Sequence, residues 1–234
     1  MGWPPGYRPR QELMDEERLA RTLARMAHEI VERHRDMSRL AFVGVRSRGV
    51  PLARRLAAIV KQASGTEPPV GALDITLYRD DLTTIAPNPV MKGTDVAFSI
   101  DGRPVVLVDD VLYTGRTVRA ALDELIDFGR PGRIELAVLV DRGHRELPIR
   151  ADYAGRVITT TRDEIVQVLL REQDGEDRVV LLDRQRSSDA TVRPVRAGKA
   201  SRPRPGRRPA DPGPARRPAK RPGRPEPPAG RRRR

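Results

Sequence analysis

Two adjacent carboxylates and a hydroxyl-rich turn lie within a stretch of nine residues in the middle of the chain. Asp109 and Asp110 directly follow Val105–Val108, an apolar run typical of a parallel strand that is buried on both faces. Thr114–Thr117 then leads into an amphipathic helical pattern, which stops at Gly129. The sequence therefore predicts that the two carboxylates and the turn share one junction between a strand and a helix.

The side chains at this junction suit a phosphorylated sugar. The N-terminus of a helix presents unpaired backbone N–H groups and the positive end of the helix dipole, both of which attract a phosphate. Gly115 allows close approach of the backbone, and Thr114 and Thr117 add hydroxyl donors. Asp109 and Asp110 can accept hydrogen bonds from ribose hydroxyls and can tolerate a Mg²⁺ ion held mainly by substrate oxygens. The competing interpretation is a helix cap beside a solvated acidic pair.

The charge of the chain is unevenly distributed. Asp189–Arg234 holds 16 Lys and Arg residues against 3 Asp and Glu, whereas the preceding 188 residues hold 29 of each sign. The net charge of +13 therefore belongs to the C-terminal part. The chain has no cysteine, which excludes disulfides and thiolate metal sites, and no apolar run of membrane-spanning length. We expect a cytoplasmic protein.

Composition and pattern predict three segments. Residues 1–13 are rich in Pro and Gly, which predicts a flexible N-terminal arm. Residues 14–186 carry the strand and helix patterns of one domain. Residues 187–234 are rich in Arg and Pro and contain no aromatic residue, which predicts a disordered basic tail.

A helical pattern over residues 14–35 has two different faces. Its apolar face comprises Leu19, Leu23, Met26 and Ile30. Its opposite face is basic and comprises Arg21, Arg25, His28 and Arg35. The pattern predicts an exposed basic face, which is either an ordinary solvated surface or a binding surface.

Other apolar runs predict further strands around the same site. The main ones span residues 40–45, 72–78 and 134–140, and a helix is expected to begin near Pro51. In open α/β sheets, ligands bind beyond the carboxyl ends of the strands. We therefore expect the loops after these strands to converge, so that Ser47 and Arg48 bind pyrophosphate; a simple turn is the alternative.

The remaining patterns predict a cover for the site. Residues 79–99 are polar and lack a clear period, which is typical of a binding loop or of plain disorder. Short strands are predicted at residues 157–160, 166–170 and 179–182. We expect these strands to form an edge that closes over the substrate.

The chain resembles known families at two levels. Val105–Thr117 resembles the motif with which type I phosphoribosyltransferases bind 5-phosphoribosyl-1-pyrophosphate (PRPP). A narrower resemblance, over about Met14–Asp183, is to pyrimidine operon attenuation regulators that are also uracil phosphoribosyltransferases. Its most discriminating stretches are Leu73–Leu82 and Leu136–Tyr153. The resemblance implies an α/β fold of the type I phosphoribosyltransferase class, with a mainly parallel central sheet flanked by helices and a small hood.

The same resemblance implies a reaction and a set of site residues. Uracil and PRPP would give UMP and pyrophosphate, with Mg²⁺ held through the substrate and not directly by the protein. Asp109 and Asp110 would hold the ribose hydroxyls and Thr114–Thr117 the 5′-phosphate. Ser47, Arg48 and, on a lid, Arg79 would meet pyrophosphate, while Arg142 and Ile158 would lie at the base. The implied PRPP-binding residues are Val105, Val106, Leu107, Val108, Asp109, Asp110, Val111, Leu112, Tyr113, Thr114, Gly115, Arg116 and Thr117.

The resemblance also implies an RNA-binding face and a homo-oligomer, a dimer or higher. The face would bind the leader RNA of the pyrimidine operon when UMP or UTP is bound. Its implied residues are Arg25, His28, Arg33, His144, Arg145, Arg150 and Arg156. Catalysis is a rival role for His144 and Arg145, which lie just past a predicted strand end.

The sequence leaves two alternatives to a bifunctional protein. One is a purely metabolic phosphoribosyltransferase of base salvage, whose basic face has no RNA partner. The other is a regulator that senses UMP and has lost useful catalysis; the intact acidic pair and Ser47-Arg48 argue against it. Base selectivity is a further question, because Arg156–Thr160 reads Arg-Val-Ile-Thr-Thr where the family commonly has Lys-Asn-Val-Pro-Thr.

Overall fold

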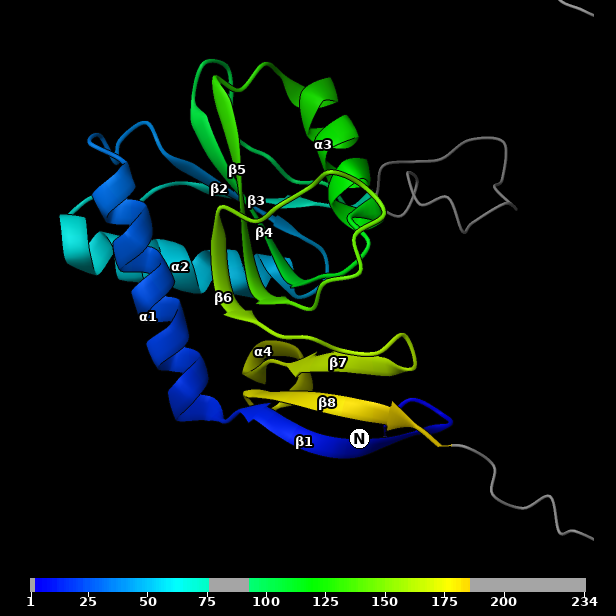
Figure 1. Cartoon of the computed structure of the whole chain (residues 1–234). Helices are drawn as coiled ribbons and strands as arrows, with labels where there is room; N and C mark the ends of the chain where they lie inside the picture. Colours follow the sequence, from blue (N-terminus) through cyan, green and yellow to red (C-terminus); the bar gives the residue numbers. More distant parts are fainter. Residues whose placement is uncertain (1–2, 76–92, 186–234) are drawn as a thin grey trace, which may run out of the picture. The chain divides into compact units, whose positions relative to one another are not determined.

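The computed structural model describes residues 3–75 and 93–185 (Figure 1). Arg79, most of the predicted binding loop and the predicted basic tail lie outside these residues. Among the described residues, no helix is both long enough and apolar enough to span a membrane.

The centre of the fold is a parallel sheet of five strands in the order β3-β2-β4-β5-β6. The strands are β2 (Ala41–Val45), β3 (Val70–Leu73), β4 (Pro104–Leu112), β5 (Arg133–Asp141) and β6 (Tyr153–Val157). The helices are α1 (Glu16–Arg33), α2 (Gly49–Ser64) and α3 (Arg116–Phe128). One face of the sheet packs on α1 and α2 and the other on α3, so the fold has two apolar cores (Figure 1). This is the α/β architecture that the sequence predicts.

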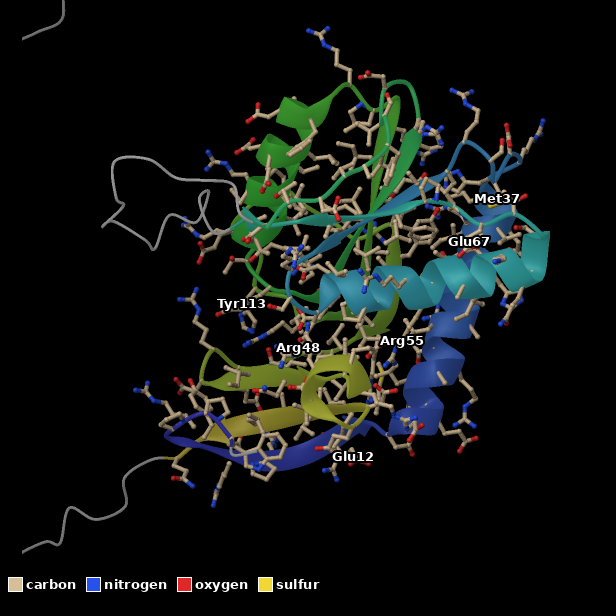
Figure 2. The ribbon with its side chains drawn as sticks, turned by 180° about the vertical axis from the view of Figure 1, so that it is seen from behind. Glu12, Met37, Arg48, Arg55, Glu67 and Tyr113 are labelled. Carbon is tan, nitrogen blue, oxygen red and sulfur yellow. The ribbon has the colours of Figure 1, made fainter. Side chains whose placement is uncertain are left out.

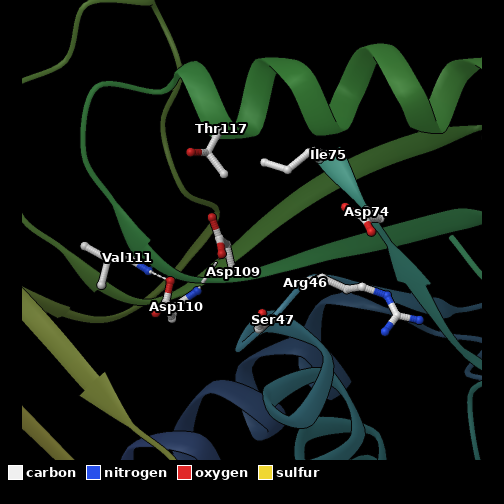
Figure 3. Close-up of a pocket in the computed structure, with 8 residues that line it drawn as sticks. All are labelled: Arg46, Ser47, Asp74, Ile75, Asp109, Asp110, Val111 and Thr117. Atoms are coloured by element: carbon white, nitrogen blue, oxygen red, sulfur yellow. Dashed lines mark hydrogen bonds between the residues drawn. The ribbon is translucent and has the colours of Figure 1, made fainter. Parts of the chain in front are cut away.

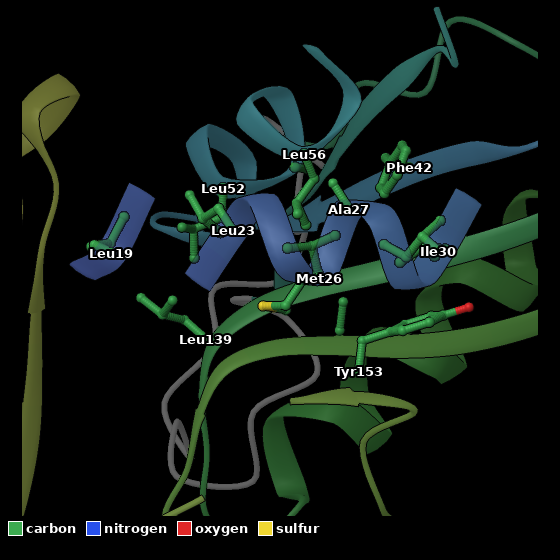
Figure 4. Packing of buried hydrophobic residues seen from close by; sticks show 14 of the residues in the cluster. Leu19, Leu23, Met26, Ala27, Ile30, Phe42, Leu52, Leu56, Leu139 and Tyr153 are labelled. Atoms are coloured by element: carbon green, nitrogen blue, oxygen red, sulfur yellow. The ribbon is translucent and has the colours of Figure 1, made fainter. Parts of the chain in front are cut away.

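Helix α1 forms where the predicted apolar and basic faces indicate. Asp15 caps its N-terminus by accepting a hydrogen bond from the Arg18 N–H group, and two glutamates in the first turn favour the helix dipole. The four predicted apolar residues are buried against α2 and the sheet (Figure 4). Arg21, Arg25 and His28 are on the exposed side of the helix, as predicted.

A separate antiparallel sheet of three strands forms a hood beside the carboxyl end of the main sheet (Figure 1). It contains β1 (Tyr7–Met14), β8 (Arg178–Arg184) and β7 (Glu164–Leu169), with the short helix α4 (Arg171–Asp174) between β7 and β8. The expected strands near 166–170 and 179–182 are therefore present, within a residue or two.

The expectation of a flexible arm over residues 1–13 is wrong. Tyr7–Met14 is an edge strand that pairs with β8 from Tyr7↔Arg184 to Met14↔Val179. An edge strand tolerates Pro9, because one side of its backbone has no ladder partner. Leu13 and Met14 anchor the end of the strand in the core, with side chains that are almost fully buried.

Three strand boundaries also differ from the expectation. Strand β3 begins earlier, at Val70, and ends at Leu73. Strand β4 does not end before the acidic pair; its ladder with β5 continues through Asp109↔Val138 to Leu112↔Asp141. The strand predicted at 157–160 is in fact β6, which pairs in parallel with β5 in the main sheet and not in the hood. Tyr153 is fully buried. Its burial places β6 at Tyr153–Val157, earlier in the chain than the predicted strand.

Candidate active site

A pocket of ≈ 410 Å³ opens at the carboxyl ends of β2, β3 and β4 (Figure 3). It lies where the loops after these parallel strands converge, as the fold class leads us to expect. The residues that line it are Arg46, Ser47, Asp74, Ile75, Asp109, Asp110, Val111 and Thr117. The pocket therefore unites the predicted acidic pair with Ser47 and with the start of the predicted phosphate-binding helix.

The acidic pair is held by the backbone of β4. The Asp109 carboxylate accepts a hydrogen bond from the Asp110 N–H group at 2.9 Å, and Asp110 accepts one from the Val111 N–H group at 2.8 Å. Burial, together with the neighbouring charge of Asp110, raises the pKa of Asp109 well above its ordinary value. Burial also raises the pKa of Asp110, although the Val111 N–H group and Arg48 oppose that rise. The pair is therefore poised to receive hydroxyl donors or a cation.

The turn before α3 has the properties of an anion site. Gly115 is its N-cap and adopts φ +94°, a left-handed conformation that favours glycine. Gly115 has no side chain with which to cap this end of the helix, and the Thr114 hydroxyl accepts only a long hydrogen bond, of 3.4 Å, from the Arg116 N–H group. The first turn of α3 contains no acidic residue. A Cβ atom on Gly115 would lie 3.4 Å from Leu147 and Ile149. The backbone N–H groups at the start of α3 and the Thr117 hydroxyl can therefore bind a phosphate.

A second glycine brings the start of α2 against β4. A Cβ atom on Gly49 would lie only 2.2 Å from the carbonyl oxygen of Val108, so no other residue fits here without a shift of the backbone. This close approach places the cis peptide of Arg46–Ser47, and Ser47 itself, beside the acidic pair.

Arg48 lies at the border between the pocket and the hood. Its Nη2 atom donates to Asp174 of α4 at 3.0 Å, and Arg55 of α2 forms ion pairs with Glu172 and Asp177 (Figure 2). Arg48 does not line the pocket, but its charge opposes the rise in the pKa of Asp110 that burial causes. Its buried Nε atom has no hydrogen-bond partner among the described residues.

The pocket also contains three residues that were not predicted as site residues, Arg46, Asp74 and Ile75. Arg46 belongs to the predicted loop after β2, and its side chain donates to the carbonyl oxygen of Gly93. Asp74 and Ile75 belong to the Leu73–Leu82 stretch that carries the family resemblance. That stretch was the available signal, but it did not show which side chains face the ligand.

The two predicted base-binding residues do not line this pocket. Arg142 is buried, and its guanidinium donates to the Thr160 hydroxyl and to the carbonyl oxygens of Thr161 and Glu164. It also stacks over the Tyr113 ring, with the guanidinium carbon 4.1 Å from the ring centroid. Ile158 packs partly against the larger apolar core. Both residues therefore lie just past the carboxyl ends of β5 and β6, next to the hood.

The predicted RNA-binding residues fall into two structural groups. On one side, Arg25 of α1 donates to the carbonyl oxygens of Ala154 and Gly155 in β6. His28, Arg33 and Arg156 belong to the same pair of elements, α1 and β6. By contrast, the His144 ring contacts the Tyr113 ring, with centroids 5.7 Å apart, and Arg145 donates to the carbonyl oxygen of Tyr113, directly before the predicted phosphate-binding turn. Arg150 is exposed after that loop.

The donor set of the pocket fits a metal ion that arrives with a substrate. The described residues contain no group of three or more His, Asp or Glu side chains arranged to hold a metal by themselves. However, Asp74, Asp109 and Asp110 line the pocket, against one arginine. A polyanionic substrate would be repelled by three carboxylates unless a cation accompanied it, and Mg²⁺ bound through substrate phosphates meets this need.

Comparisons of fold support the class that this geometry indicates. A family profile described as "Phosphoribosyl transferase domain" matches residues 9–172. A hypoxanthine phosphoribosyltransferase of Trypanosoma cruzi has a TM-score of 0.57, at 18% identity, over 75% of this chain and 98% of that chain. One from Staphylococcus aureus has a TM-score of 0.56, at 20% identity, over 74% and 92%. The fold and the pocket thus define a type I phosphoribosyltransferase.

Relatives with higher identity define the family more narrowly. Over 176 residues, the chain is 58% identical to "Bifunctional protein PyrR" of Pelotomaculum thermopropionicum, which covers 75% of this chain and 97% of that protein. It is 56% identical over 175 residues to the PyrR protein of Deinococcus radiodurans, over 75% and 96%. The chain therefore belongs to the PyrR family.

Proposed function

We propose that the protein transfers the phosphoribosyl group of PRPP to uracil, giving UMP and pyrophosphate, and that it binds the leader RNA of a pyrimidine operon when a uridine nucleotide is bound. The carrying observation is that a chain of the bifunctional PyrR family places an acidic pair, Asp109 and Asp110, in one pocket with the N-terminus of α3, whose first turn contains no acidic residue. A phosphorylated ribose needs acceptors for its hydroxyls and N–H donors for its phosphate, and here the two features lie within nine residues of each other.

Each element of the pocket has a distinct role in this proposal. The turn Thr114–Thr117 binds the 5′-phosphate through backbone N–H groups and hydroxyls. The raised pKa values of Asp109 and Asp110 reflect the burial of the pair, and the ribose hydroxyls supply further hydrogen-bond donors to its carboxylates. Ser47 and Arg48, at the start of α2, bind pyrophosphate. Mg²⁺, when bound with PRPP, neutralises the phosphate charge that faces the three carboxylates.

The base is proposed to lie beyond the ribose, toward the hood. Arg142 and Ile158 remain the proposed base-binding residues, although they do not line the described pocket. The guanidinium of Arg142 is fixed by three acceptors of the segment 160–164. Arg142 can therefore orient the backbone of residues 160–164, the segment that leads into strand β7 of the hood.

The RNA-binding face is proposed to lie on α1 and β6. Arg25, His28, Arg33 and Arg156 combine positive charge with planar side chains, which suit phosphates and unpaired bases. Exposed Arg150 is included in this proposal, as is a homo-oligomer of the chain. His144 and Arg145 are less suited to RNA, because their side chains contact the phosphate-binding turn and its neighbours.

A purely metabolic enzyme of base salvage is the second candidate. Its supporting observation is that Arg25 donates two hydrogen bonds to β6 carbonyl oxygens, so that part of the basic face already has a structural role. This candidate predicts the same uracil chemistry and no nucleotide-dependent RNA binding.

Release of pyrophosphate from PRPP tests the catalytic half of the proposal. With Mg²⁺ and PRPP present, we expect release that depends on uracil and that hypoxanthine and guanine do not support. A coupled pyrophosphate assay with each base in turn measures this directly. Release with hypoxanthine but not with uracil would contradict the proposed base, and no release with any base would contradict the activity.

Replacing Gly115 by Ala should weaken PRPP binding by about tenfold or more. The substitution forces a side chain into a left-handed conformation, at ~1–2 kcal/mol, in the backbone that approaches the phosphate. Gly102→Ala is a matched control, because Gly102 also has a positive φ, of +65°, but lies in a turn with no atom within 4 Å of the added Cβ. Both variants should lose similar stability, and only Gly115→Ala should raise KM for PRPP. An equal KM in the two variants would argue against the phosphate role of this turn.

A further inference from the structure

The loop after β5 packs directly on the phosphate-binding turn. The N–H groups of Glu146 and Leu147 both donate to the carbonyl oxygen of Thr114, at 2.9 and 3.3 Å. The Glu146 carboxylate also accepts a hydrogen bond from the Arg116 side chain at 2.8 Å. One loop therefore holds the turn through both its backbone and a side chain.

Arg145 is the centre of this support. Its Nη1 atom donates to the carbonyl oxygens of Tyr113 at 2.6 Å and Leu112 at 3.5 Å, which lie at the end of β4. The same atom reaches the carbonyl oxygen of Gly143 at 3.0 Å, and Nε reaches that of Ile149 at 3.0 Å. Nη2 pairs with the Asp141 carboxylate at the end of β5. All three guanidinium nitrogens therefore have acceptors within the protein.

These contacts fix the peptide groups that enter the phosphate-binding turn. A peptide group is planar, so a held Tyr113 carbonyl also fixes the direction of the Thr114 N–H group. A phosphate site built from backbone N–H groups depends on such directions more than on side chains. An arginine supplies five donors on three nitrogens in a rigid planar fork, whereas a lysine has three donors on a single nitrogen and cannot reach acceptors spread around the fork.

We propose that Arg145 is a positioning residue that holds the phosphate-binding turn of residues 113–117 in its ligand-binding conformation. It does not line the pocket and does not touch the reacting atoms. Its side chain is only 22% exposed, which leaves little of the guanidinium for an RNA phosphate. The inference rests on the proposed function, which supplies the ligand, PRPP or UMP. It assigns Arg145 an effect on nucleotide binding in place of a direct contact with RNA.

Substitution of Arg145 separates the two roles. We expect Arg145→Gln and Arg145→Lys each to weaken the binding of Mg²⁺–PRPP and of UMP by about tenfold or more, measured by calorimetry on the full chain. The failure of Lys to rescue is informative, because it keeps the charge that an RNA contact would use but loses the fork. Arg130→Gln is the control, since Arg130 is exposed in the loop after α3; it should leave both affinities within twofold of wild type.

RNA binding provides the second readout. In the Arg145 variants, the UMP concentration needed for half-maximal leader-RNA binding should rise by the factor found for UMP itself, and the RNA affinity at saturating UMP should stay unchanged. Normal PRPP and UMP affinities in Arg145→Lys, or a loss of RNA affinity that saturating UMP does not restore, would overturn the inference. If Arg145→Gln does not fold, Arg145→Lys decides alone. Calorimetry with PRPP does not require turnover, so a wild-type chain that binds PRPP without using uracil would disprove the proposed base and leave this test intact.

Discussion

Replacing both Asp109 and Asp110 by Asn should lower the rate of UMP synthesis by about 10²–10⁴-fold while the chain stays folded. Each carboxylate is proposed to accept a hydrogen bond from a ribose hydroxyl, and hydrogen bonds to charged groups contribute ~1.5–3 kcal/mol each. The loss of two such bonds accounts for the expected range. A steady-state assay of uracil turnover measures the effect. Asp123→Asn is the control, because the Asp123 side chain is exposed.

The same double variant should be as stable as the wild type or more stable at neutral pH. The pKa values of both carboxyl groups are raised in the folded chain, so folding favours their protonated forms. The wild type therefore loses stability as the pH rises through and above the ordinary range of aspartate, and the amides remove this loss. Thermal melts from pH 4 to pH 8 should show a flatter curve for the variant. Near-normal turnover in the double variant would contradict the proposal that the acidic pair binds the ribose hydroxyls.

Removal of the residues after Asp189 should cause the largest change in nonspecific binding to nucleic acid. The removed segment carries 16 Lys and Arg residues, and each cation that neutralises a phosphate of a single strand contributes about 0.7 to the slope of log affinity against log salt. If even some of these cations contact phosphates, the truncated chain should have a much flatter slope than the wild type between about 50 and 200 mM salt. Fluorescence anisotropy with a labelled single strand measures both slopes.

Uracil turnover and the melting temperature should be nearly unchanged by this truncation, because the segment is rich in Pro and lacks aromatic residues. A full-length chain in which Gln replaces the basic residues after Asp189 is the matched control for length, and it should bind as weakly as the truncated chain. A large drop in melting temperature, or an unchanged salt slope, would contradict the prediction.

The features predicted from sequence are those with local signals. The buried strands β2, β4 and β5 are continuous apolar runs, and the apolar face of α1 repeats with the helical period. The predicted phosphate-binding turn also has a local signal, because a strand, two acids, a glycine turn and a helix follow one another in the chain. These elements could be placed without knowledge of their partners.

The features that were missed depend on distant parts of the chain. Tyr7–Met14 has the composition of a loop, and only its pairing with β8, more than 160 residues later, makes it a strand. Asp74 enters the pocket because β3 lies beside β2, which local sequence does not reveal. Arg145 follows a strand end, where a basic residue can serve a ligand, an RNA or the backbone; only its acceptors distinguish these roles.

The measurement that tests the bifunctional account most directly is binding of the protein to its own pyrimidine-operon leader RNA, with and without UMP. The chain truncated after Asp189 is best suited, because it lacks the nonspecific contribution of the basic segment. We expect UMP to increase the affinity, and Arg25→Ala with His28→Ala to reduce it at least tenfold at saturating UMP, since one charged contact typically contributes ~1–3 kcal/mol. Leader affinity that does not respond to UMP, in a protein that turns over uracil, would contradict the account and leave a metabolic enzyme only.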